Sequence, residues 1–338
     1  MVKPLIISIT TTALLGLSPA LSHHSATIFD RTAVTVFQGK VTRFPWTNPH
    51  VYIYVETQTE NGELVEWEVE TDATPILTRS GWTSTSLMPG DQVLVRAYPD
   101  KRIEHKHALL VSISTETETL SARSYFLRKT DDMDLRSSAS DISGIWELGY
   151  SDFIQFYENW GEAMLTDRGI AARADYSVIS DSPQAQCIAI PSPASLISPN
   201  LNEIKITENS LIIRNERFNV ERAIYIDGRE QPAEEPYSNQ GYSIGRWEGE
   251  TLVVETSLFE PHRSPVIGSG VPSGINKHVT ERFTLNEDGT ELHIDYVLED
   301  PEYLETPFTG TVIWHYAPHF PMLGFDCDPN NASQFTLQ

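Results

Sequence analysis

The chain has 338 residues, enough for two domains that each bury a core of their own. It carries 47 acidic and 24 basic side chains, which gives a formal net charge of −23 at pH 7. A surface of this sign repels the phosphates of nucleic acids and the head groups of anionic lipids, so the composition argues against a nucleic-acid partner.

The first 22 residues have the pattern of a secretory signal peptide. Lys3 precedes an apolar run that ends near Leu17, and the small residues Ala20 and Ser22 stand at the two recognition positions of a signal peptidase. A membrane anchor is the weaker alternative, because the apolar run is short and contains threonines and a proline. We expect a mature chain that begins at His23, has no transmembrane segment and is periplasmic or secreted.

Residues 23–115 predict a small five-stranded barrel. A short helix at 73–80, ended by Gly81, separates the third strand from the fourth. The strands are expected at 34–44, 50–58, 64–70, 92–97 and 107–114. This order is typical of an OB-type barrel, which binds ligands on one face. Its strands are acidic, so we expect a binding or docking module that does not bind nucleic acid.

Residues 116–141 are rich in Ser, Thr and charge and are expected to be a linker. Residues 142–330 predict a larger antiparallel barrel of the lipocalin-like type, with a β-sandwich as the alternative, and 331–338 form a tail. Its clearest element is a hairpin in Gly241–Phe259, where Gly249 supplies the positive φ of the turn. Further strands are expected at 203–207, 211–216, 221–227, 276–286, 290–299 and 308–316. An up-and-down barrel of about eight or nine strands can hold one small ligand.

Two shorter features precede these strands. Residues 166–174 predict a short helix with Thr166 as its N-cap. Residues 183–199 contain four prolines and Cys187, which predicts a loop.

In an oxidising compartment we expect Cys187 and Cys327 to form a disulfide in preference to two free thiols. Closing a loop of about 140 residues would restrict the unfolded chain by roughly 5 kcal/mol.

The mature N-terminus is a candidate metal site. The free α-amine, His23 and His24 bring several nitrogens together, and His50 adds another if the first strand carries the terminus toward the second. Amine and imidazole nitrogens suit divalent copper or zinc. The alternative is that His23 and His24 are a solvated terminus and that His50 caps a strand.

Polar residues on the strands of the second domain are candidates for a ligand anchor or an acid–base pair. The catalytic candidates are His278, Glu281, Asp227 and Tyr242, and the ligand-binding candidates are Arg222, Arg246, Trp247 and Glu255. His278 and Glu281 are three residues apart, so a regular strand places them on opposite faces, and a joint role requires a bulge or another strand. The alternative is ion pairs outside the barrel or one buried structural pair.

Several motifs in residues 23–114 resemble one family. They include His23-His24-Ser25, Trp46-Thr47-Asn48-Pro49-His50, Trp67-Glu68-Val69-Glu70 and Pro89-Gly90-Asp91. The set resembles exported bacterial proteins of unknown function whose mature chains open with His-His-Ser and carry an Asn-Pro-His motif. The stretch from Gly241 to Gly249 resembles the C-terminal region of longer members, which often have His in place of Tyr242. The resemblance implies an envelope location and two domains, and no established activity.

Two hypotheses from different classes follow. The preferred one is an exported binding protein whose C-terminal barrel holds a small apolar or amphipathic molecule, with a metal at the N-terminal histidines. The other is a secreted enzyme with acid–base residues in the barrel pocket. Service as a structural component or protein partner in the cell envelope is a third.

Overall fold

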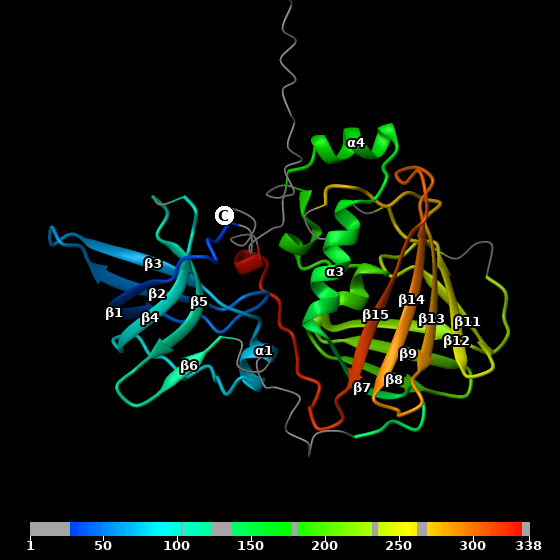
Figure 1. Cartoon of the computed structure of the whole chain (residues 1–338), viewed down its shortest axis with the longest axis horizontal. Helices are drawn as coiled ribbons and strands as arrows, with labels where there is room; N and C mark the ends of the chain where they lie inside the picture. The colour runs from blue at the N-terminus through cyan, green and yellow to red at the C-terminus, as the bar shows by residue number, and fades with distance from the viewer. Residues whose placement is uncertain are drawn as a thin grey trace, which may run out of the picture.

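The computed structural model describes residues 28–102, 104–122, 137–177, 181–231, 236–261 and 269–332, which form two closed β-barrels (Figure 1). The smaller barrel, drawn in blue and cyan, lies beside the larger one, drawn in green to orange, and the red C-terminal segment runs between them. The predicted all-β architecture, a small OB-like barrel followed by a larger one, is confirmed. No helix in the described ranges is long and apolar enough to cross a membrane.

The first barrel is built from five strands and one short helix. These are β1 (Thr35–Arg43), β2 (Tyr52–Gln58), β3 (Leu64–Glu70), α1 (Thr74–Arg79), β4 (Gln92–Pro99) and β5 (His107–Ser114). A parallel pairing of β3 with β5 closes the barrel. Trp67 and Val69 on β3 pack into the core. Because strand faces alternate, the glutamates between and after them form a row on the outer face. Helix α1 ends before Gly81, which has a φ of +90°.

The second barrel has nine strands, which follow one another around the barrel in chain order. They are β7 (Gly144–Leu148), β8 (Asn202–Ile206), β9 (Ser210–Asn215), β10 (Val220–Tyr225), β11 (Tyr242–Glu248), β12 (Thr251–Ser257), β13 (His278–Leu285), β14 (Glu291–Glu299) and β15 (Phe308–Tyr316). An odd number of strands that alternate in direction cannot close with antiparallel pairs alone. The one parallel pair of this barrel is β10–β11. The predicted hairpin is β11–β12, and Gly249 has a φ of +65°.

A helix that the sequence did not predict completes the wall of the second barrel. On its β15 side, strand β7 pairs with Trp314–Tyr316 at the end of that strand, and α3 (Tyr150–Gly161) lies along the rest of β15. There the Asp152 carboxylate accepts the backbone N–H of Ile313 at 3.1 Å. Phe156 and Trp160 of α3 are buried, and both pack edge-on against Phe308. The helix therefore supplies aromatic side chains to the barrel core.

Two smaller elements surround these barrels. Strand β6 (Thr119–Ser121) pairs with β5, so the segment predicted as a linker begins with a strand. Helix α4 (Asp167–Ala174) starts where predicted, and the Thr166 hydroxyl accepts the N–H of Gly169. Strand β6 has three residues, which is too few for a hydrophobic period to be recognised in the sequence.

The proline-rich loop enters the second barrel. We call Cys187–Ser198 the strap; it contains the 3₁₀ turn η3 (Ala194–Ile197), and η2 (Pro183–Gln186) precedes it. Leu196 and Ile197 of the strap belong to the barrel core, and the Trp314 indole donates to the Leu196 carbonyl at 2.8 Å. The predicted disulfide between Cys187 and Cys327 is confirmed, with 6.0 Å between the Cα atoms.

Two candidate functional sites

The four catalytic candidates do not lie together. Glu281 faces the interior of the second barrel and is fully buried, whereas His278 is on the outer face, 3.6 Å from the Glu299 carboxylate. Asp227 binds Arg229 at the surface, and the Tyr242 ring packs against Tyr225. The predicted opposite faces of His278 and Glu281 explain this separation, since β13 is regular through both residues. The geometry gives an acid–base reaction at this set no support.

The ligand-binding candidates are separated in the same way. Arg222 lies inside the barrel, but Arg246 is exposed and binds both Glu248 and Glu255 on the outer surface. Trp247 is 43% exposed near the turn of the hairpin. Arg222 is thus the one member of the predicted set that lies inside the barrel. Arg246 and Glu255 form an ion pair outside the barrel, as the alternative expected, and Trp247 is a surface side chain.

Arg222 and Glu281 form a polar cluster inside the second barrel. The guanidinium donates to both Glu281 oxygens, one of them at 3.0 Å and the other at 2.5 Å. It also donates to the hydroxyls of Ser243 and Thr256 at 3.0 and 2.7 Å. Ser192 of the strap donates to Glu281 at 2.6 Å. The pair is thus satisfied by protein groups, as burial of two charges requires.

Lys277 is a second buried charge near this cluster. It is 2% exposed, and its ammonium group donates to the Ser192 carbonyl at 2.7 Å and lies 4.2 Å from the centre of the Phe259 ring. Burial lowers the pKa of Lys277 to about 7, although the carboxylates of Asp300 and Glu281 partly oppose this shift. Lys277 therefore anchors the strap with a hydrogen bond and carries a charge that burial disfavours.

A small cavity, of about 20 Å³, lies beside these groups in the second barrel, between Leu196, Ile213, Arg222, Gln240 and Trp314. This volume has room for about one water molecule. Leu196 and Ile197 of the strap pack in the barrel interior with aromatic side chains such as Trp314.

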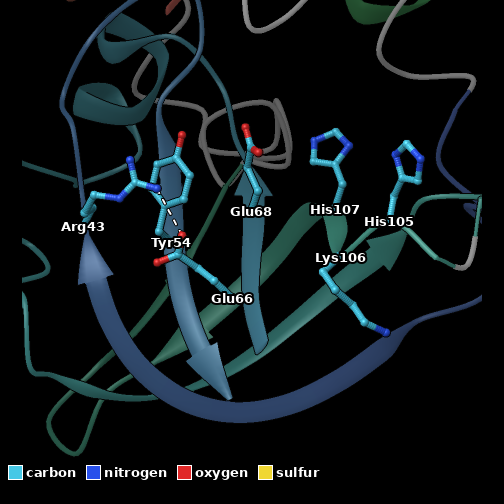
Figure 2. A pocket seen from close by; sticks show the side chains of 7 residues that line it. All are labelled: Arg43, Tyr54, Glu66, Glu68, His105, Lys106 and His107. Carbon is cyan, nitrogen blue, oxygen red and sulfur yellow. Dashed lines mark hydrogen bonds and ion pairs between the residues drawn. The ribbon is translucent and has the colours of Figure 1, made fainter. Parts of the chain in front are cut away.

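A larger cavity, of about 320 Å³, lies on the outer face of the first barrel (Figure 2). It is lined by Arg43 at the end of β1, Tyr54 of β2, Glu66 and Glu68 of β3, and His105, Lys106 and His107 at the start of β5. In OB-type barrels the face of the second and third strands, with the adjoining loops, is the ligand-binding face. We call this cavity the outer-face pocket.

One wall of the outer-face pocket is an ion pair. Arg43 binds the Glu66 carboxylate at 3.1 Å and covers the Tyr54 ring at 3.6 Å from its centre. Glu66 also accepts the Thr42 hydroxyl at 2.6 Å, and these contacts hold the pKa of that carboxyl below its usual value. Burial raises the pKa of the Tyr54 phenol, which therefore stays protonated. The wall presents fixed donors and acceptors to the pocket.

The inner end of the outer-face pocket is a buried histidine. The His107 side chain is 6% exposed, and neither ring nitrogen has a hydrogen-bond partner among the described residues. Carboxylates lie nearby on both sides, with Glu70 at 3.6 Å and Asp100 at 3.5 Å. The Phe29 ring packs against the imidazole at 4.7 Å between ring centres. Buried polar groups are rarely left without any partner, and the carboxylates of Glu70 and Asp100, at ion-pair distance, are the partners of the His107 nitrogens.

His50 belongs to the same cluster. Its Nδ1 donates to the Thr71 carbonyl at 2.8 Å and lies 3.3 Å from Glu70. In the neutral ring this hydrogen bond leaves the lone pair on Nε2, the arrangement common in histidines that bind metals. His23 and His24 lie outside the described residues. Within the described part of the chain, no group of three or more His, Cys, Asp and Glu side chains could hold a metal ion.

Residues 13–108 match the family of unknown function DUF6152. The resemblance expected from the motifs is thus confirmed for the first barrel. All residues that line the outer-face pocket fall within the matched range. No curated protein matches the chain.

Sequence reasoning named none of the residues that line the outer-face pocket as a site residue, and it also missed Glu70 beside His107. The glutamates of β3 were visible in the sequence, but only as acidic strand residues. His107, the residue of β5 that lies beside these glutamates, is brought there by the parallel pairing of β3 with β5, in which Glu68 is opposite His107. That pairing closes the barrel and leaves no local sequence signal. A count of polar residues on the outer faces of the predicted OB strands would have been the available signal.

Proposed function

We propose that this protein is an exported binding protein and that it holds a small polar molecule in the outer-face pocket. The observation that carries the proposal is a cavity of about 320 Å³ with His107 at its inner end, a buried imidazole that pairs with Glu70 and Asp100 but forms no hydrogen bond with any described residue. Ligand pockets of proteins begin at about this volume. The position on the β2–β3 face, where OB-type barrels bind ligands, supports the same conclusion.

The test is a thermal-shift screen of the mature full-length chain. The panel contains neutral sugars and polyols, amino acids, amines and small carboxylates. We expect at least one compound to raise the melting temperature of the wild type but of neither Glu68→Gln nor His107→Asn. The matched control is Glu116→Gln in the β5–β6 turn, which should respond like the wild type. An empty screen, or a shift that survives both pocket substitutions, would contradict the proposal.

The second barrel is the second candidate, for a small apolar or amphipathic molecule. The observation in its favour is the Arg222–Glu281 pair, a polar anchor inside an apolar wall. A ligand would have to replace the strap, which side-chain hydrogen bonds from Lys277 and Trp314 hold in place. Native mass spectrometry of the chain purified from its host envelope tests this candidate, because a retained organic mass that survives Glu68→Gln would assign the ligand to the larger barrel.

Metal binding at the mature N-terminus, through His23, His24 and His50, is a separate part of the proposal, with copper or zinc as the ion. The described chain begins beside the His50–Glu70–His107 cluster, since Phe29 packs on His107. Metal analysis of the correctly cleaved chain tests this part. We expect stoichiometric metal in the wild type and weaker binding in His50→Ala, and equal affinity of the two would remove His50 from the site.

A further inference from the structure

The chemistry of the outer-face pocket narrows the ligand class, and this inference rests on the proposed function. The pocket is lined by two cationic side chains, Arg43 and Lys106, and two carboxylates, Glu66 and Glu68. Arg43 and Glu66 already neutralise one another at 3.1 Å. A balanced lining selects neither an anion nor a cation. The net charge of −23 further disfavours an anionic ligand at long range.

Donors and acceptors alternate around the pocket. Figure 2 shows the Glu68 carboxylate and the His107 and His105 rings projecting toward the same side, from strands that pair at Glu68 and His107. On the other wall, a guanidinium stands beside a carboxylate. A ligand group that both donates and accepts hydrogen bonds can bind the donor and the acceptor of such a pair at the same time. A hydroxyl group has this property. A molecule with several neighbouring hydroxyls fits the lining better than one with a single charged group.

The inner end of the pocket favours the same group. A neutral imidazole has one donor and one acceptor nitrogen, and which nitrogen carries the proton can change to suit the ligand. Both nitrogens of His107 lack a hydrogen bond among the described residues, but each lies at ion-pair distance from a carboxylate, Nε2 at 3.6 Å from Glu70 and Nδ1 at 3.5 Å from Asp100. A hydroxyl beside this ring would add a hydrogen bond without bringing a further charge next to these groups. Burying a neutral group costs far less than burying an ion.

We infer that the outer-face pocket binds a neutral saccharide, with hydroxyls placed between Glu68 and His107 and against the Arg43–Glu66 pair. The cavity volume of about 320 Å³ suits a short saccharide segment. This chemistry is shared by a free sugar and by the end of a surface polysaccharide. The length dependence of binding distinguishes the two sources.

The experiment is isothermal titration of the mature full-length chain with defined sugars. The neutral probes are glucose, maltotetraose, cellotetraose and mannotetraose. The charged probes are tetragalacturonate and the chitosan tetramer. We expect at least one neutral probe to bind, with each charged probe at least about tenfold weaker. Equal affinity for monomer and tetramer indicates a free sugar, and tighter binding of the tetramer indicates a polysaccharide end.

Two substitutions assign the binding to the pocket. Glu68→Gln keeps the side-chain shape and removes one acceptor charge, and His107→Asn removes the imidazole. Each should weaken the neutral probe at least about tenfold, whereas Glu116→Gln should bind as the wild type does. Glu68 lies at the surface of the fold, so Glu68→Gln remains informative if the buried substitution fails to fold.

Each other outcome overturns a stated part. Pocket-dependent binding of a charged probe alone overturns the saccharide inference and leaves the binding function standing. If a neutral probe binds but neither substitution changes its affinity, the sugar binds outside the outer-face pocket, which overturns the inference. Absence of any sugar binding overturns the inference, and it overturns the proposed function as well when the wider screen of polar compounds is also empty.

Discussion

At the scale of single residues, Lys277 is the group whose charge state the fold changes most plainly. Its ordinary pKa is 10.5, and burial lowers it to about 7. Between these values the unfolded chain holds a proton here that the folded chain has released. The free energy of unfolding should therefore rise with pH from about 7 toward 10.5, because protons bound only by the unfolded state stabilise that state at low pH.

Lys277→Met tests this linkage. The substitution removes the titrating group, so the variant should gain stability relative to the wild type near pH 7 and lose this advantage progressively at higher pH. The measurement is urea unfolding of both proteins at several pH values between 6.5 and 9.5. Lys205→Met is the control, since Lys205 is exposed and should leave the slope unchanged. Parallel curves for the wild type and Lys277→Met would refute the assigned pKa.

Residue-scale prediction succeeded where strand alternation alone decides the outcome. The opposite faces of His278 and Glu281 followed from their spacing of three residues. It failed where partners come from distant strands. The partner of Glu281 is Arg222, 59 residues away, and the neighbour of Glu68 is His107. Such pairings are fixed by barrel closure, which a single sequence does not encode locally.

At the scale of elements, strand bounds were predicted closely. The ranges 64–70, 107–114 and 308–316 are those of β3, β5 and β15. Helix α3 was missed, because its sequence is rich in aromatic residues that favour strands. Its buried residues, Phe156 and Trp160, are four apart, as a helix face requires. That spacing was the signal that the composition concealed.

The strap supplies a prediction at this scale. The disulfide links Cys187 of the strap to Cys327, 140 residues away in sequence. Replacement of both cysteines by serine should lower the free energy of unfolding by about 2–5 kcal/mol, mainly because the unfolded chain regains freedom. The measurement is urea unfolding at pH 7 with and without a reducing agent.

Reductant should destabilise the wild type and leave the double variant unchanged, which serves as the control. When the disulfide is removed, backbone hydrogen exchange should become faster in the strap before it becomes faster in β13 and β14. The reason is that the strap is held by side-chain hydrogen bonds, such as that from Trp314, and not by pairing with a strand. A loss of less than about 1 kcal/mol would show that the loop-closure account does not hold for this chain.

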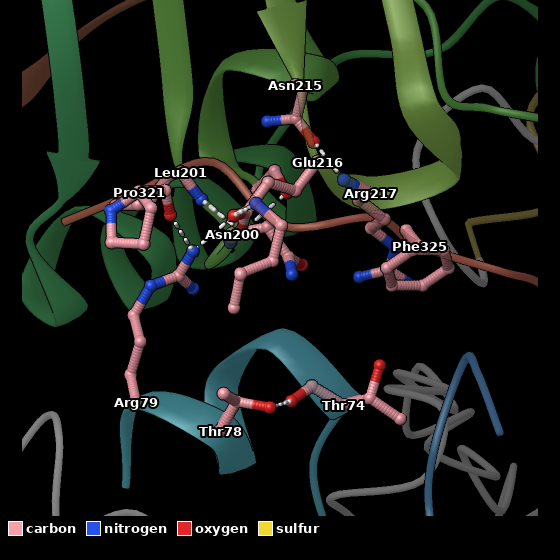
Figure 3. A network of polar contacts seen from close by, with 12 residues as sticks. Thr74, Thr78, Arg79, Asn200, Leu201, Asn215, Glu216, Arg217, Pro321 and Phe325 are labelled. Carbon is pink, nitrogen blue, oxygen red and sulfur yellow. Dashed lines mark hydrogen bonds and ion pairs between the residues drawn. The ribbon is translucent and has the colours of Figure 1, made fainter. Parts of the chain in front are cut away.

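At the scale of the whole molecule, one buried ion pair joins the two barrels. Arg79 at the end of α1 binds the Glu216 carboxylate beside β9, and Figure 3 shows the guanidinium reaching across to Glu216 and Pro321. Glu216 also accepts the backbone N–H groups of Leu201 and Leu323 at 3.2 and 2.7 Å. One carboxylate therefore holds parts of both barrels and of the C-terminal segment.

Removal of one member of the Arg79–Glu216 ion pair should make the unfolding of the two barrels less cooperative. Glu216→Gln leaves the Arg79 charge buried without its counterion, so we expect a loss of about 3–5 kcal/mol. In calorimetry the variant should unfold in two transitions, one for each barrel. Adding Arg79→Met should recover part of the loss. The exposed pair of Arg214 and Glu203 is the control, and Arg214→Met should cost less than about 1 kcal/mol. A single transition at the wild-type midpoint would contradict the coupling.

The C-terminal segment between the barrels also sets an order of assembly. The backbone carbonyls of Asn48 and His50 in the first barrel accept hydrogen bonds from this segment. The donors are the backbone N–H of Asp328 and the side-chain amide of Asn331. During synthesis from the N-terminus, these contacts and Cys327 arrive after every strand of both barrels. Any strands that pair before residue 327 has been made therefore form while Cys187 is a thiol without its partner. An oxidant that takes two electrons in this interval would join Cys187 to a small thiol or to Cys187 of a second chain. Attack of the Cys327 thiolate on Cys187 would then form the native bond and release that thiol.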